Sequence, residues 1–162
     1  MTEVHIRGLN GETIALSNDI LTTLRSELDG SLCLPDEAGY DEARTIWNAM
    51  IDRRPGAVVR CQVASDVIGA VRLARDNGLL LAVRGGGHNI AGNAVCEGGL
   101  LIDLSPMRSV HIDAKERIAR VEPGVTLAEF DREAQSFGLA TPLGINSTTG
   151  VAGLTLGGGF GW

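Results

Sequence analysis

The sequence lacks features that would place it at a membrane or on nucleic acid. It has no long apolar run: the segment "GLLLAV" is far too short to span a bilayer, and residues 1–17 hold no apolar stretch typical of a secretory signal. It also lacks positive charge, because the formal net charge is −6 and no Lys/Arg-rich run occurs. These absences predict a cytoplasmic protein with neither a membrane nor a nucleic acid as its partner.

Cysteine is scarce as well. Cys33, Cys61 and Cys96 are odd in number and show no C-x-x-C spacing. No pair among these cysteines and the three histidines lies at the spacing of a zinc site. We therefore expect reduced thiols in a cytoplasmic protein and no metal site.

Glycine, by contrast, is abundant, with 22 glycines in 162 residues. They gather in two blocks, residues 85–99 and 144–161, with patterned helix and strand sequence between them. Because glycine loses more conformational freedom on folding than any other residue, such clusters need a structural reason. The blocks predict two backbone surfaces that come close to another group.

Apolar periodicity and capping residues predict four helices and five strands. The helices lie in 16–28, 34–54 (after a loop, ending before Pro55), 64–78 and 125–138, and the strands in 57–61, 79–84, 99–105, 109–113 and 117–124. Ser17 is the expected N-cap of the first helix and Ser65 of the third, and a capping box links Thr126 to Glu129 in the fourth. The order mixes βαβ and antiparallel pieces, which favours an α+β fold.

The glycine blocks match neither of two standard phosphate-binding patterns. No glycine is followed by lysine, which excludes the phosphate-binding loop G-x-x-x-x-G-K-[ST]. The dinucleotide pattern G-x-G-x-x-G fails at its third glycine in both blocks, where Ile90 and Trp162 stand instead. A phosphate-bearing ligand held by another backbone geometry remains open.

His88 ends the first glycine run, directly after a buried strand. Taken alone, it is either a surface or hydrogen-bonding histidine, or a general base or nucleophile, since neutral imidazole is nucleophilic near neutral pH. No G-x-S-x-G segment accompanies it, so hydrolase chemistry has little support.

Several motifs occur in a familiar order: "AVRGGGHNIAGNAV", "GGLLIDLSPMRSVHID", "ARVEPGVTL" and "LATPLGINSTTGVAGLTLGGGFGW". Together they resemble the FAD-linked oxidases of the vanillyl-alcohol oxidase superfamily, and within it the berberine-bridge-enzyme-like flavoproteins. The resemblance covers residues 38–162. It implies the N-terminal part of a PCMH-type FAD-binding domain: a small mixed sheet with flanking helices and part of a second antiparallel subdomain. Residues 1–37 are expected to form an N-terminal extension with a helix.

The resemblance also implies roles for single residues. In the family, a loop like Arg84–His88 holds the FAD pyrophosphate on backbone N–H groups, and its histidine is bonded to the 8-methyl carbon of the flavin. Asn146 stands where bicovalent members have a cysteine, so the resemblance implies one covalent link, through His88 only. Leu154 stands where many members have a second histidine, and this puts oxidase-type tuning of the flavin in doubt.

The residues implied to contact FAD lie in both glycine blocks and the strand between them. They are Arg84, Gly85, Gly86, Gly87, His88, Asn89, Gly92, Leu104, Asn146, Thr149, Gly150, Val151, Gly153, Leu154, Gly157, Gly158 and Gly159. Plainer roles stay open for some positions: Asn146 as an ordinary turn residue, Asp103 and Leu104 as sheet packing. Trp47 and Trp162 are expected to pack rather than to stack on flavin.

Members of the family pass hydride from a small organic substrate to FAD and then to oxygen or another acceptor. We expect this chain to be the FAD-binding part of such an oxidoreductase. It ends inside a glycine-rich turn, so we expect a further substrate domain, with the catalytic base, beyond it; none of its own residues is assigned a catalytic role. Two alternatives remain: a non-catalytic flavin-binding module, inactive alone, and an unrelated glycine-rich interaction domain.

Overall fold

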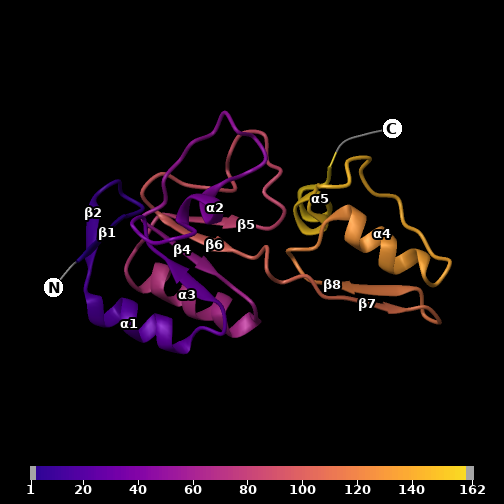
Figure 1. The fold of residues 1–162 in the computed structure, drawn as a ribbon, viewed down its shortest axis with the longest axis horizontal. Helices are drawn as coiled ribbons and strands as arrows, with labels where there is room; N and C mark the ends of the chain where they lie inside the picture. The colour runs from indigo at the N-terminus through magenta and orange to yellow at the C-terminus, as the bar shows by residue number, and fades with distance from the viewer. Residues whose placement is uncertain (1–2, 160–162) are drawn as a thin grey trace.

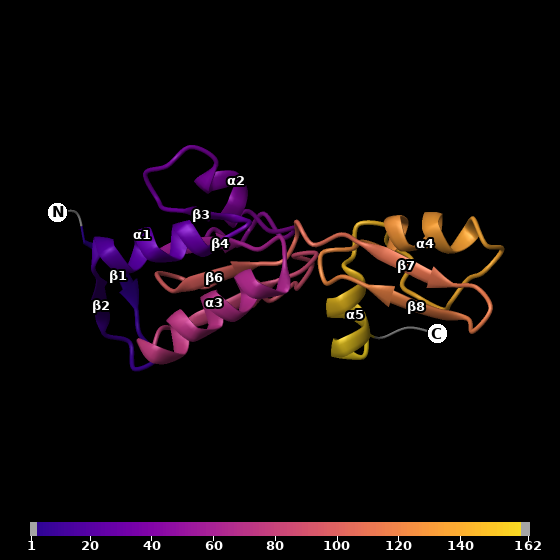
Figure 2. The ribbon, with the colours of Figure 1, turned by 90° about the horizontal axis from the view of Figure 1, so that it is seen from below.

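The computed structural model describes residues 3–159, which form two lobes (Figure 1). The first lobe, residues 3–104, holds strands β1–β6 and helices α1–α3, and the second lobe, residues 107–159, holds β7, β8, α4 and α5. Figure 2 shows the two lobes end to end along the long axis. The glycine loop after β5 and the start of α5 lie at their junction. The predicted packing role of Trp162 falls outside the described residues.

A four-stranded mixed sheet is the centre of the first lobe. Its strand order is β3-β4-β6-β5, with β4 and β5 parallel to β6 and β3 antiparallel to β4. The strands are β3 (Ser31–Cys33), β4 (Ala57–Arg60), β5 (Leu81–Arg84) and β6 (Leu100–Asp103). Because the three parallel strands end at the same edge, their last residues Arg60, Asp103 and Arg84 are direct neighbours in register.

Both faces of this sheet are buried, as is usual for parallel strands. Val59 and Ile102 face a core built with helices α1 (Asn18–Glu27) and α3 (Ala64–Asp76). Val58 and Leu101 point the other way, into a smaller core with Tyr40 on α2 (Tyr40–Arg44) and with the chain around Val95. Successive strand residues therefore alternate between two cores.

The second lobe pairs a hairpin with a helix. Strands β7 (Val110–Asp113) and β8 (Ile118–Val121) are antiparallel, and α4 (Leu127–Gln135) packs on them (Figure 1). Phe130 of α4 and Val151, the first residue of α5 (Val151–Gly157), share this lobe's core. The core thus ties the second glycine block to the hairpin lobe.

Most predicted elements are present. All five predicted strands and the first, third and fourth helices occur within one to three residues of their expected bounds. Ser17 caps α1, where its hydroxyl oxygen accepts a hydrogen bond from the Ile20 N–H at 3.5 Å. The Glu129 carboxylate reaches back to the Thr126 N–H at 2.8 Å, as the capping box requires.

Two details of the prediction are wrong. The second helix ends at Arg44 rather than before Pro55, because the segment that follows is tied to the loop after His88: the Asn48 amide donates to the Ile90 carbonyl. The third helix begins one residue before Ser65, so this serine lies in its first turn and not at the N-cap. The buried Asp66 supplies the capping carboxylate instead.

Other elements were not predicted. A hairpin of β1 (Val4–Arg7) and β2 (Thr13–Leu16) turns through Asn10-Gly11, a common hairpin signal, and Gly11 has a φ of +87°. The N-terminal segment packs in the same core as the sheet, and β3 extends that sheet. Helix α5 (Val151–Gly157) forms within the second glycine block, where no helix was expected. Glycine is a poor helix former, and burial of Val151 helps to offset this low propensity.

None of the helices in residues 3–159 combines the length and the apolar character that a membrane-crossing helix needs.

We predict that Asp66→Asn lowers the free energy of unfolding by about 2–3 kcal/mol at neutral pH. The Asp66 carboxylate accepts backbone N–H bonds from Asp29 at 3.0 Å, Gly30 at 3.1 Å and Gln62 at 2.8 Å, and the amide NH₂ would face some of these donors. Chemical denaturation measures the loss. Asp36→Asn, at an exposed carboxylate, is the matched control.

The pH dependence tests the same contact. Burial alone would raise the pKa of Asp66, but the backbone N–H bonds hold this pKa below its usual value. A lowered pKa in the folded state contributes stability above the unfolded pKa of about 3.9, and this stability is lost as the pH falls below it. The wild type should therefore lose more stability than Asp66→Asn between roughly pH 5 and pH 3. Equal losses would contradict this account.

Candidate cofactor site

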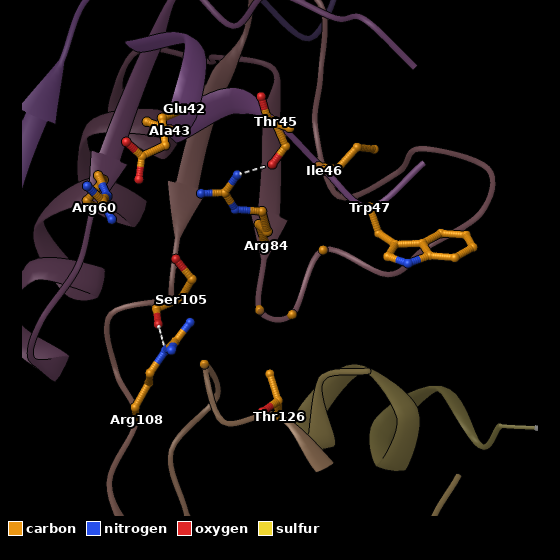
Figure 3. A pocket seen from close by; sticks show the side chains of 14 residues that line it. Glu42, Ala43, Thr45, Ile46, Trp47, Arg60, Arg84, Ser105, Arg108 and Thr126 are labelled. Atoms are coloured by element: carbon orange, nitrogen blue, oxygen red, sulfur yellow. Dashed lines mark hydrogen bonds between the residues drawn. The ribbon is translucent and has the colours of Figure 1, made fainter. Parts of the chain in front are cut away.

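A buried ion pair anchors the first glycine loop. Arg84, the last residue of β5, donates from Nε to Asp103 Oδ1 at 3.0 Å, and a terminal nitrogen lies 2.6 Å from Oδ2. Its other terminal nitrogen donates to the Thr45 carbonyl at 2.8 Å (Figure 3). The guanidinium is thus engaged by protein groups, and its task in this structure is to fix the strand end from which the loop departs.

Asp103 is the charged centre of this anchor. Its side chain is fully buried, and it also accepts the Ser105 N–H at 3.0 Å and lies 3.4 Å from Nε of Arg60. Burial alone would raise the pKa of Asp103, but the hydrogen bond and charge of Arg84 hold it below its usual value. The carboxylate is therefore ionised at neutral pH. Asp103 thus has an electrostatic role beside Arg84 in addition to packing in the sheet.

The two glycine blocks meet at Gly86 and Gly150. A Cβ on Gly86 would lie 2.5 Å from the Gly150 Cα and N, and a Cβ on Gly150 would lie 2.7 Å from the Gly86 N. Such distances leave no room for any side chain at either position. The absence of side chains here lets two backbones from different lobes touch.

The next residues in the loop need glycine for a second reason. Gly87 has a φ of +68°, in the left-handed region that side chains disfavour. A Cβ on Gly85 would lie 2.6 Å from the Pro123 carbonyl oxygen. Backbone packing and chain direction therefore account for the whole glycine run.

His88 follows this run and is held by two groups. Its Nε2 lies 2.9 Å from the Thr148 hydroxyl oxygen, and its ring stacks on the Trp47 indole with centroids 4.5 Å apart and an angle of 24° between planes. The Thr148 hydroxyl in turn donates to Asn146 Oδ1 at 3.0 Å. The structure thus connects two predicted site residues, His88 and Asn146, through Thr148, which was not predicted.

A pocket of about 280 Å³ lies at the junction of the lobes, beside the first glycine loop (Figure 3). Its walls combine glycine backbone with basic side chains. Lining residues from both lobes include Arg60, Arg84, Gly85, Gly86, Gly87, Arg108 and Thr126. The Arg84 and Arg108 guanidinium groups are already paired with Asp103 and Glu129, and Glu42 also lines the pocket. Arg60 and the backbone that carries no side chains are therefore the groups that favour an anion there.

A second pocket of about 560 Å³ opens in the second lobe. Its walls are mainly apolar: Phe130, Pro142, Leu143, Val151 and Leu154 contribute to them. The predicted site residues are therefore divided, with Gly85–Gly87 at the basic pocket and Val151 and Leu154 at the apolar one. An apolar wall at Leu154 offers no charge at that position.

The remaining predicted residues shape the backbone or lie open. The Asn89 side chain accepts the Asn93 N–H at 3.0 Å, Leu104 donates its N–H to the Arg84 carbonyl at 2.8 Å, and the Thr149 carbonyl accepts from Leu127 at 2.9 Å. Gly92 lies against Ile51 with a φ of +77°. Added Cβ atoms on Gly153, Gly157 or Gly158 would meet nothing within 4 Å.

Three residues at the site were missed by sequence reasoning. Thr148 touches His88, and Arg60 and Arg108 line the basic pocket. The only local signal was the short Asn-Ser-Thr turn sequence, in which Asn146 binds the Thr148 N–H. Within residues 3–159, no group of three or more His, Cys, Asp or Glu side chains could hold a metal ion.

Comparison with protein families matches residues 55–162 to the FAD binding domain family. The chain belongs to this family. (R)-6-hydroxynicotine oxidase of Paenarthrobacter nicotinovorans is 40% identical to this chain over 147 residues, which make up 91% of this chain and 32% of that protein. Aclacinomycin-N/aclacinomycin-A oxidase of Streptomyces galilaeus is 38% identical over 118 residues, 71% of this chain and 22% of that protein. The chain spans about a third or less of these relatives.

Solved structures of FAD-linked enzymes share the fold. The crystal structure of 6-hydroxy-D-nicotine oxidase from Arthrobacter nicotinovorans has a TM-score of 0.76 and 41% identity, over 78% of this chain and 28% of that chain. Phl p 4, a grass pollen allergen with glucose dehydrogenase activity, has a TM-score of 0.79 and 29% identity, over 88% and 32%. The expected α+β, PCMH-type FAD-binding fold is confirmed.

We predict that Gly86→Ala lowers the free energy of unfolding by about 1–3 kcal/mol, because its Cβ would force two backbone segments apart. Chemical denaturation measures the change. The matched control is Gly69→Ala in α3, where the added Cβ would lie 3.8 Å from a Leu24 methyl group and the helix would gain up to about 1 kcal/mol. A Gly86→Ala protein as stable as the wild type would show that the lobes do not depend on this contact.

Proposed function

We propose that this chain holds FAD at the junction of its two lobes and serves as the flavin-binding part of an oxidoreductase that acts on a small organic substrate. The observation that carries the proposal is the meeting of the two glycine blocks beside a basic pocket, at Gly86 and Gly150. Family membership and relatives named as FAD-linked oxidoreductases support it.

The residues present fit the cofactor. The basic pocket, with Arg60 and Arg108 at its walls and the glycine loop beside it, suits a pyrophosphate, since backbone N–H groups and guanidinium groups both favour anions. Open space at Gly153 and Gly157 leaves room for a ligand next to α5. The apolar pocket at Val151 and Leu154 suits uncharged ring surface.

We further propose that His88 is the sole covalent attachment point, bonded to the 8-methyl carbon of the flavin. His88 lies at the end of the loop and at the contact between the lobes, while Asn146, where a second link would require a thiol, has an amide. When bound, FAD supplies the hydride acceptor for substrate oxidation. The chain's own residues bind and orient it, and we assign none of them as the catalytic base.

We propose that this chain works in a reducing compartment, because its three cysteines are not joined in disulfides. Cys33, Cys61 and Cys96 are all free thiols. Burial raises the pKa of Cys61 to about 12 and also raises that of Cys96, so neither is a ready nucleophile.

We predict that the chain incubated with FAD keeps flavin through acid precipitation. The tryptic peptide Gly85–Arg108 should carry the flavin mass, and His88→Ala should abolish it. His111→Ala, in the exposed hairpin β7–β8, should label like the wild type. Peptide mass spectrometry makes the measurement. An unmodified peptide together with a flavin that co-elutes with native protein would overturn the covalent link but leave FAD binding standing; colourless native protein would overturn both.

A non-catalytic flavin-binding module is the second candidate. The specific observation in its favour is that Leu154 offers no charged group at the apolar pocket. Turnover separates the two candidates in a protein that joins this chain to the further part that its relatives have. If the chain serves an oxidoreductase, substrate should reduce the flavin; if it is a non-catalytic module, flavin should bind and no substrate should reduce it.

A further inference from the structure

The hydrogen bonds around His88 determine which of its ring nitrogens carries the proton. The chain of contacts runs from Asn146 to Thr148 to His88. Asn146 Oδ1 accepts the Thr148 backbone N–H at 3.3 Å, and a backbone N–H can only donate. This contact orients the amide, so that its oxygen and not its nitrogen faces Thr148.

The Thr148 hydroxyl has one proton to give. Asn146 Oδ1 lies 3.0 Å from the hydroxyl oxygen and can only accept, so the proton points to Asn146. The hydroxyl oxygen then offers a lone pair to His88 Nε2, 2.9 Å away, and Nε2 must be the donor. A neutral imidazole carries one ring proton, so when this proton is on Nε2 the lone pair of Nδ1 is free.

We infer that Asn146 and Thr148 form a positioning relay that holds His88 as its Nε2–H tautomer and so keeps the Nδ1 lone pair free for the proposed bond to the flavin. This inference rests on the proposed attachment at His88. Among the described residues, no hydrogen bond occupies Nδ1. The Trp47 indole, stacked at 4.5 Å, holds the plane of the ring. Asn146 thus has a task of its own at the position of the second link in bicovalent relatives.

The relay also assists the bond-forming step. Once the 8-methyl carbon has given up one C–H proton, with the electron pair of that bond passing into the flavin ring, Nδ1 would donate its lone pair to that carbon and form the C–N bond. The imidazole would be cationic until Nε2 released its proton. Bond formation would leave the flavin reduced by two electrons, and dioxygen as external oxidant would accept these electrons and the two released protons to give hydrogen peroxide. An Nε2–H bond to the Thr148 oxygen stabilises the cationic ring, because hydrogen bonds to charged groups are stronger than neutral ones.

The first test reads the tautomer in the FAD-free chain by ¹⁵N NMR of the imidazole nitrogens. We expect His88 to be almost wholly Nε2–H, with His5 and His111 as internal references for histidines without this relay. Asn146→Ala frees the Thr148 hydroxyl to donate to Nε2, which should shift His88 toward Nδ1–H. Thr148→Val should give a mixture like that of the references, and Thr148→Ser should restore the wild-type spectrum. The control Ser147→Ala removes a neighbouring hydroxyl and should change nothing.

The second test reads the bond itself. In the flavin peptide, we expect the 8-methylene protons to correlate by NMR with imidazole Cγ and Cε1, as attachment at Nδ1 requires. Thr148→Val should slow covalent incorporation on the order of tenfold, and Thr148→Ser should restore it. Correlation with Cδ2, or a wild-type His88 that is Nδ1–H, would overturn the inference. If no flavin attaches, the proposed tether fails while the tautomer measurement still decides the relay.

Discussion

Backbone contact between Gly86 and Gly150 is the constraint on which the site depends. Each glycine excludes a Cβ on the other, so the two segments can touch only because both lack side chains. Each segment is fixed in its own lobe: Val151 donates its N–H to the Val125 carbonyl at 2.9 Å, and Leu104 binds the Arg84 carbonyl at the start of the first loop. The contact therefore joins two anchored surfaces, and it brings His88 to Thr148.

A buried ion pair supports this contact from the first lobe. Parallel register alone places Arg60, Asp103 and Arg84 side by side at the carboxyl edge of the sheet. Burying such charges is costly, and removing one partner of a buried pair typically destabilises a protein by about 3–5 kcal/mol. The pair is better explained by placement than by stability, because Arg84 also binds the Thr45 carbonyl and thereby holds the chain that carries Trp47. Strand ends, loop and histidine form one connected set of contacts.

The sequence predicted what local patterns encode. Alternating and helical periodicity located five of the eight strands and three of the four predicted helices, and the capping box at Thr126 and Glu129 occurs as expected. The clustering of glycines indicated that the backbone comes close to another group. It did not indicate that the two glycine blocks contact each other. Helix α5 was missed because its glycines favour loops, and only tertiary contacts such as the burial of Val151 reveal it.

The candidate site was harder to predict because its contacts are non-local. Thr148 lies 60 residues from His88, so no spacing rule connects them. The motif around Arg84 predicts that this residue binds the ligand. In the structure its guanidinium is bound to the Asp103 carboxylate instead. The resemblance to a family implied the cofactor and the role of the histidine. The relay from Asn146 through Thr148 to His88 could be found only in the three-dimensional structure.

In the proposed arrangement, the two glycine blocks form one cofactor site. Hydrogen–deuterium exchange of the chain with and without FAD tests it most directly. We expect slower amide exchange in both residues 85–89 and residues 146–151 when FAD is present, with the hairpin β7–β8 unchanged. Protection confined to one of the two segments, or absent from both, would contradict a shared site at their contact.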